Sequence, residues 1–122
     1  PVIRASKRTI LTADNYAIAL ARLKRFEEAK SLLRKTIPVA RRVLGESHQL
    51  ALRMRKVYAK ALFMDDAATL DDLREAVTTL VETERTARRV LGGAHPVTTG
   101  IEGALRDARA ALRARETPSG SA

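Results

Sequence analysis

Three basic residues at helical spacing are the part of this sequence best suited to bind a ligand. Arg53, Lys56 and Lys60 are three and four positions apart, so on a helix they share one face. Like charges on one face repel each other, and a carboxylate or phosphate from a partner would relieve that repulsion. The spacing therefore predicts an anion-binding surface. The alternative is a solvated helix face that is simply rich in lysine and arginine.

The two histidines are the other side chains that could do chemistry. His48 and His95 each stand three positions after the end of one copy of the sequence ARRVLG. Because equivalent positions in a repeat lie about one unit apart, we expect both to structure a turn rather than to share a metal. The aspartate-rich segment 65–72 lacks the glycine and the distal glutamate of a calcium loop. The sequence predicts no metal and no other cofactor.

Sequence motifs for catalysis are missing. There is no Gly-rich phosphate loop, no GxSxG, no HExxH and no cysteine. Two isolated histidines without an evident partner do not make a general base. The chain is therefore predicted not to be an enzyme.

Composition and charge narrow the choice of partner. The 122 residues carry a net charge of +9, from 23 Lys and Arg against 14 Asp and Glu, which favours acidic partners. The aromatic residues Tyr16, Phe26, Tyr58 and Phe63 are all expected in the core, so stacking on single-stranded nucleic acid is not predicted. Binding of a phosphate backbone by the basic faces remains an alternative.

No membrane association is predicted, because no apolar run is long enough to span a bilayer. The lack of cysteine fits a reducing compartment, and we expect a cytoplasmic location. The chain begins with Pro1 rather than Met, so we expect it to be a piece of a longer protein.

An internal repeat indicates the fold. The six residues ARRVLG occur at 40–45 and again at 87–92, an offset of 47 residues. Such self-similarity is typical of folds built from stacked copies of one small unit. Leu33 and Leu80 are equivalent positions under this offset, and both are expected in a single shared interior.

Apolar residues at spacings of three and four predict five antiparallel helices. The expected helices span about residues 5–23, 26–44, 48–62, 70–91 and 96–112. Gly45 and Gly92 fit C-terminal caps, and Thr69 with Asp72 forms a capping box. The expected organisation is one helical domain over residues 1–114 and a disordered tail over residues 115–122.

The residues that mark the repeat resemble a known family. In the first unit they are Asn15, Ala17, Leu20, Arg25, Phe26, Glu27, Glu28, Ala29, Val43, Leu44, Gly45 and His48. In the second unit they are Tyr58, Ala59, Leu62, Leu73, Glu75, Ala76, Val90, Leu91, Gly92, His95 and Pro96. The stretch of about 10–98 is similar to the tetratricopeptide repeats of kinesin light chains. The unit here is longer than the family's, and Lys24 stands where the family has a turn glycine.

The resemblance implies an all-α fold of antiparallel helical hairpins, stacked as a short solenoid of about five helices. It also implies a non-catalytic module for protein–protein interaction. In this family the first helix of each pair lines the concave face, which adds Asn15 and Arg22 to Arg53, Lys56 and Lys60. An asparagine amide at that position binds a peptide backbone group in the family. The predicted function is binding of an acidic or extended peptide segment on a basic concave face.

Two other functions stay open at this point. One is a basic scaffold that binds nucleic acid or other polyanions. The other is self-assembly, for example as a homodimer, through the exposed ends of a short array. A second basic stripe, made of Arg106, Arg109 and Arg113, is expected to be the exposed outer face of a terminal helix.

Overall fold

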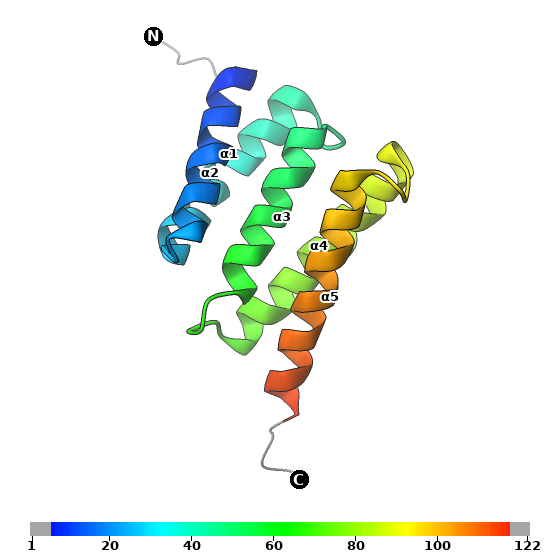
Figure 1. Cartoon of the computed structure of the whole chain (residues 1–122). Coiled ribbons are helices and arrows are strands. Elements are labelled where there is room, and N and C mark those ends of the chain that lie inside the picture. The colour runs from blue at the N-terminus through cyan, green and yellow to red at the C-terminus, as the bar shows by residue number, and fades with distance from the viewer. Residues whose placement is uncertain (1–5, 118–122) are drawn as a thin grey trace.

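The computed structural model describes residues 6–117, and within that range the chain is all helical apart from its turns. The helices are α1 (Lys7–Arg22), α2 (Phe26–Leu44), α3 (Gln49–Phe63), α4 (Leu70–Leu91) and α5 (Pro96–Glu116). Consecutive helices run antiparallel and pack against each other as hairpins (Figure 1). The predicted all-α fold of stacked helical hairpins is confirmed. No helix in the described range is long and apolar enough to cross a membrane.

The ends of α2 and α4 form where the sequence places capping residues. The Thr69 hydroxyl accepts the backbone N–H of Asp72 at 3.1 Å, and the Asp72 carboxylate accepts that of Thr69 at 2.9 Å. This reciprocal pair is the predicted capping box. Gly45 and Gly92 follow α2 and α4 with φ angles of 98° and 93°, where a residue with a Cβ would be strained.

The two histidines are helix N-caps, which confirms their predicted role in turns. His48 Nδ1 accepts the backbone N–H of Leu50 at 3.0 Å, and His95 Nδ1 accepts that of Val97 at 3.1 Å. Each bond satisfies one of the free N–H groups in the first turn of the helix that follows. Gln49 Nε2 lies 3.2 Å from His95 Nε2 and so links the starts of α3 and α5.

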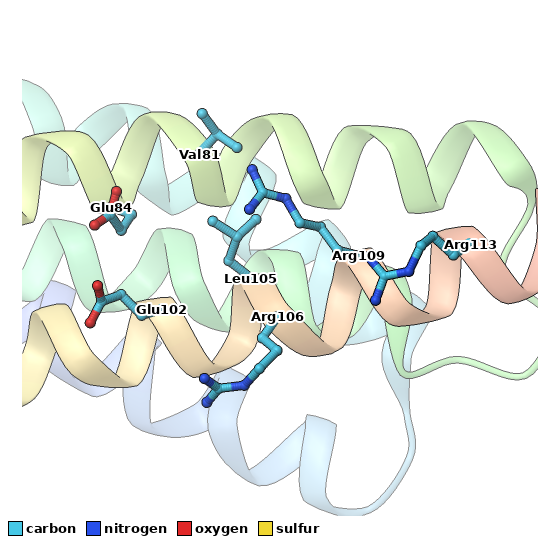
Figure 2. Close-up of a pocket in the computed structure, with 7 residues that line it drawn as sticks. All are labelled: Val81, Glu84, Glu102, Leu105, Arg106, Arg109 and Arg113. Carbon is cyan, nitrogen blue, oxygen red and sulfur yellow. The ribbon is translucent and has the colours of Figure 1, made fainter.

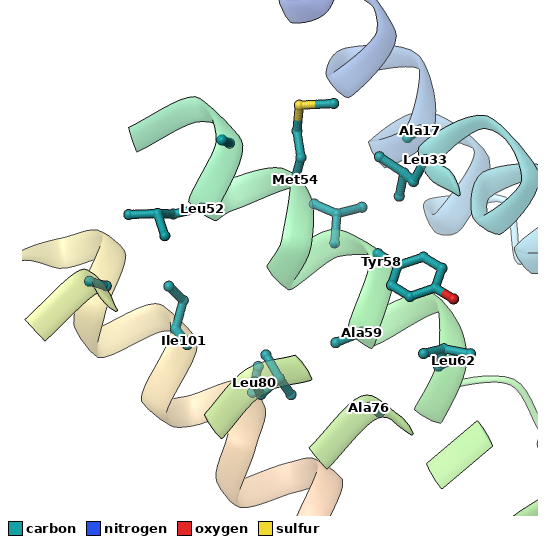
Figure 3. Packing of buried hydrophobic residues seen from close by; sticks show 14 of the residues in the cluster. Ala17, Leu33, Leu52, Met54, Tyr58, Ala59, Leu62, Ala76, Leu80 and Ile101 are labelled. Carbon is teal, nitrogen blue, oxygen red and sulfur yellow. The ribbon is translucent and has the colours of Figure 1, made fainter. Parts of the chain in front are cut away.

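The core lies around α3, which contacts all four other helices. Its Leu52, Met54 and Leu62 side chains are fully buried. Leu33 from α2 and Leu80 from α4 belong to the same buried cluster, and neither has any exposed surface (Figure 3). The two copies of the repeat therefore share one interior, as predicted.

One aromatic residue was predicted wrongly. Tyr16 is 57% exposed, whereas Tyr58 is buried and the two phenylalanines are partly buried. The Tyr16 ring lies on the outer side of the α1–α2 hairpin, beside Leu32 and Lys35. No further helix among residues 6–117 packs on that side, so the ring faces solvent.

The boundary of the predicted tail was also wrong by two residues. Helix α5 continues to Glu116, because its last turn is tied to the α3–α4 connection and to α4. The Arg115 guanidinium donates to the Ala68 carbonyl at 2.6 Å, and an Arg74 nitrogen lies 3.7 Å from a Glu116 oxygen. Residues 118–122 of the predicted tail lie outside the described range.

Candidate functional site

A groove between α1 and α3 contains all five residues predicted to bind a peptide. It consists of two adjoining pockets that share Ile18 and Arg22. One pocket, of about 620 Å³, is lined by Asn15, Arg22 and Arg53. The other, of about 280 Å³, is lined by Arg22, Lys56 and Lys60. Residues from the two copies of the repeat thus meet along one continuous surface, which we call the α1–α3 groove.

The floor of the α1–α3 groove is apolar. Ile18 from α1 and Val57 from α3 lie along it, and Phe26 and Met64 close one end. Met64 is 52% exposed, which is a large exposed fraction for an apolar side chain. A floor of this kind can bury apolar side chains of a partner while the basic residues bind its charged groups.

A buried carboxylate lies beneath the basic residues. Asp14 of α1 has no exposed surface, and neither of its carboxylate oxygens has a hydrogen-bond partner in the described structure. An Arg53 nitrogen lies 3.9 Å from Asp14 Oδ2. Burial raises the pKa of Asp14, while the nearby charges of Arg53 and Lys56 oppose that shift. Asp14 is therefore an internal counter-ion for the groove, but an incompletely satisfied one.

The surroundings of Lys56 lower its pKa. Its partial burial lowers the pKa, and the positive charges of Lys60 and Arg53 lower it further, whereas Asp14 raises it. The predicted mutual repulsion of these three cations is thus present in the structure. A carboxylate of a partner placed between Lys56 and Lys60 would replace this repulsion by attraction to both ammonium groups.

Helix α5 also borders the site, which the sequence did not predict. A Cβ atom on Gly100 would lie 3.3 Å from Lys56 Nζ, so the glycine makes room for the ammonium group. The burial of Asp14 was missed as well. Its position four residues after Ile10 and three before Ala17, on the buried stripe of α1, was the available signal.

The positive charges of the groove have few internal partners. Within residues 6–117, no carboxylate oxygen lies within 4.0 Å of the charged nitrogens of Arg22, Lys56 or Lys60. The described part of the chain also holds no cluster of three or more side chains that could bind a metal ion. The positive charge of the α1–α3 groove is thus largely uncompensated by carboxylates of the described residues.

Comparison with known families finds a similarity in the first part of the chain. Residues 9–50 match the family model of the tetratricopeptide repeat. The match covers α1, α2 and the turn that leads into α3, which is one helical hairpin with its connection. No curated protein and no solved structure matches the chain. The first hairpin is thus similar to a tetratricopeptide repeat, and the five-helix array has the all-α architecture of stacked helical hairpins.

Proposed function

We propose that this chain is a non-catalytic, cytoplasmic interaction module that binds an extended acidic peptide segment in the α1–α3 groove. The observation that carries the proposal is the meeting of Asn15, Arg22, Arg53, Lys56 and Lys60 on one surface with few internal counter-ions. The sequence resemblance of about residues 10–98 to the repeats of kinesin light chains is a second argument for a peptide partner.

Each part of the groove has a role in this proposal. The Asn15 amide donates to and accepts from the peptide backbone, because an amide group offers both functions. Arg22, Lys56 and Lys60 bind carboxylates of the partner. An Arg53 nitrogen lies 3.9 Å from Asp14 Oδ2, farther than a hydrogen bond, so its guanidinium can donate hydrogen bonds to a carboxylate of the partner.

Binding of a labelled peptide tests the proposal. The probe is a peptide of about eight residues in which glutamate and valine alternate, since this pattern favours an extended chain. Lys56→Glu should weaken its binding about tenfold or more, because an attraction becomes a repulsion in a partly desolvated site. The matched control is Lys35→Glu, an exposed position on α2 outside the groove, which should change the affinity less than about twofold.

The polyanion scaffold is the competing function, and the net charge of +9 favours it. A single-stranded oligonucleotide of the same charge as the peptide serves as the second probe. Under our proposal the peptide binds more tightly than the oligonucleotide in both low and physiological salt, because its apolar side chains use the groove floor. Equal and salt-labile binding of both probes, with equal losses in Lys56→Glu and Lys35→Glu, would contradict the peptide groove.

A further inference from the structure

The 47-residue repeat relates two grooves on the other side of the array. The first, between α2 and α3, is lined by Arg34, Ile37, Arg55 and Tyr58 among others. Moving each position by 47 gives Val81, Glu84, Glu102 and Leu105. All four line a pocket of about 440 Å³ between α4 and α5 (Figure 2). We call this second surface the α4–α5 groove.

The groove between α2 and α3 shows which kind of secondary-structure element packs next to such a surface, namely a helix. Helix α4 packs on α3 beside this groove, and its Thr79 and Glu82 line the groove together with residues of α2 and α3. An acidic residue of α4 makes the polar contact, because the Tyr58 hydroxyl donates to Glu75 at 2.6 Å. The Arg34 Nε in turn lies 3.3 Å from the Tyr58 hydroxyl. The equivalent α4–α5 groove has no helix packed on it among residues 6–117.

Two substitutions within the repeat change the chemistry of the α4–α5 groove. Ala59 and Leu62 of α3 are fully buried, and Figure 3 shows them beside Ala76 and Leu80 of α4. Their equivalents under the offset are Arg106 and Arg109, which are exposed. A helix that presents apolar side chains there, as α4 presents Ala76 and Leu80 to α3, would bury these two guanidinium groups without partners, which is strongly unfavourable.

The charges around the groove are unbalanced. Its two carboxylates are already occupied, since Arg88 pairs with both Glu84 and Glu102. By contrast, no carboxylate oxygen in the described range lies within 4.0 Å of the guanidinium nitrogens of Arg106, Arg109 or Arg113. All three arginines line the pocket, and Figure 2 shows Arg109 beside the apolar Val81 and Leu105, Arg113 farther along α5, and Arg106 directed away from α4.

We propose that the α4–α5 groove docks an acidic amphipathic helix of a partner protein. Apolar residues of that helix cover Val81 and Leu105, and its carboxylates pair with Arg106, Arg109 and Arg113. A second copy of this chain is a less favourable occupant of the groove, because two chains of net charge +9 repel each other. Its acidic residues at the opposite end, Glu27 and Glu28, are also held by Lys30 and Arg25.

A synthetic helix tests this docking. The probe is the segment 70–91 with Ala76→Glu and Leu80→Glu, which places acidic groups where the equivalent helix faces Ala59 and Leu62. A second peptide with lysine at both positions is the charge-reversed control. The acidic probe should bind the whole chain, measured by fluorescence anisotropy, and the lysine peptide should bind at least about tenfold more weakly.

Variants locate the binding. The double variant Arg106→Glu, Arg109→Glu should weaken the acidic probe about tenfold or more, and Arg106→Gln, Arg109→Gln by a smaller factor. The matched control is Lys7→Glu, Arg8→Glu, which changes the same amount of charge on exposed positions in the first turn of α1. Arg53→Glu with Lys60→Glu should leave binding of the acidic helix unchanged, which separates this surface from the α1–α3 groove. Circular dichroism melts check that every variant is folded.

Three results would overturn the proposal. One is an equal loss of affinity in the α5 variant and in the α1 control, which indicates general charge attraction. Another is tighter binding of an oligonucleotide of equal charge that depends on Arg106 and Arg109, which indicates a nucleic-acid surface. The third is self-association of the chain, seen by sedimentation, that the same double variant abolishes. None of them bears on the peptide proposed for the α1–α3 groove.

Discussion

At the scale of single residues, Lys24 adopts a conformation that is better suited to glycine. Its φ angle is 61°, and it ends α1 in a Schellman motif: the Arg25 N–H bonds to the Leu20 carbonyl at 2.8 Å, and the Lys24 N–H bonds to the Ala21 carbonyl at 3.0 Å. A left-handed residue with a Cβ costs about 1–2 kcal/mol. The family that the sequence resembles has glycine at this turn, and the positive φ angle of Lys24 gives the physical reason for that preference.

Lys24→Gly should therefore stabilise the protein. The relief of left-handed strain exceeds the extra entropy of the unfolded glycine, so we expect a gain of about 0.5–1 kcal/mol in the free energy of unfolding. Urea denaturation followed by circular dichroism measures it. Lys24→Ala, which removes the same exposed side chain but keeps the Cβ, should show no gain. Equal stabilities of the glycine and alanine variants would contradict this account.

Asp14 predicts a pH dependence of stability. Because burial raises its pKa in the folded state, the folded chain binds a proton more tightly than the unfolded chain at pH values between the two pKa values. The free energy contributed by this group thus falls as the pH rises from the ordinary aspartate pKa through the raised one, and it is recovered on acidification. Arg53 and Lys56, the charged groups facing the carboxylate, limit the size of the effect.

Asp14→Asn isolates this contribution. Its stability relative to the unsubstituted protein should be most favourable near neutral pH and should decline as the pH is lowered toward 4, in urea titrations at several pH values. The exposed Asp107→Asn is the matched control for loss of one carboxylate. A relative stability of Asp14→Asn that does not vary with pH would show that the buried carboxylate does not titrate in this window.

The sequence predicts the residues of the α1–α3 groove better than their electrostatics. Arg53, Lys56 and Lys60 share a face because of helical spacing alone, and the family resemblance adds Asn15 and Arg22 to them. The counter-ion beneath them was not predicted, since a polar residue at a helix position near the interface can be either exposed or buried. The room that Gly100 leaves for the Lys56 ammonium group depends on how α5 packs against α3, and a local sequence pattern does not predict that packing.

At the scale of helices, one hydroxyl joins three elements. Tyr58 of α3 donates to Glu75 of α4 and lies 3.3 Å from Arg34 Nε of α2, whose guanidinium carbon is 5.7 Å from the centre of the tyrosine ring. Burial and the bond to Glu75 raise the pKa of Tyr58, so the hydroxyl keeps its proton and remains a donor.

Tyr58→Phe should destabilise the packing of α4 on the α2–α3 hairpin. Loss of one hydrogen bond to a charged acceptor at a partly buried site is expected to cost about 1–2 kcal/mol, measured by urea denaturation. Tyr16→Phe removes the same group from an exposed ring and should be neutral. If both variants unfold at the same denaturant concentration, the three-helix link contributes nothing to stability.

The helices themselves follow closely from the sequence. Glycines at 45 and 92, the Thr69–Asp72 box and the two histidines act within one or two turns, so they mark helix ends without tertiary information. Tyr16 and the end of α5 were predicted wrongly for the opposite reason. An apolar residue on a helix is buried only if another element covers that face, and Glu116 stays helical because distant parts of the chain hold the last turn.

At the scale of the whole molecule, the excess positive charge opposes folding and, under the proposed function, attracts the acidic partner. Raising NaCl from about 0.01 to 0.15 M shortens the screening length from about 30 to 8 Å, which weakens self-repulsion in a chain of net charge +9. The free energy of unfolding in urea should therefore rise over this range, while affinity for acidic peptides falls.

The variant Lys7→Glu, Arg8→Glu provides the control for this salt effect. It replaces two positive charges by two negative ones at exposed sites in the first turn of α1, so its stability should rise less with added salt. A stability that falls as salt is added would instead mean that the internal ion pairs, such as Arg25–Glu28 and Lys30–Glu27, outweigh the repulsion.

The 47-residue internal repeat makes residues 46–92 a unit that can be copied as a cassette in protein engineering. The cassette starts just after one positive-φ glycine and ends with the next, and each glycine is followed by a histidine that caps the helix beyond it. A second copy of residues 46–92 inserted after Gly92 would lengthen the array by one helical hairpin. The inserted hairpin would pack between α4 and α5, against surfaces equivalent to those that α3 and α4 already contact. The insertion belongs there and not after α5, because Arg106 and Arg109 have replaced the small and apolar side chains on which another hairpin would rest.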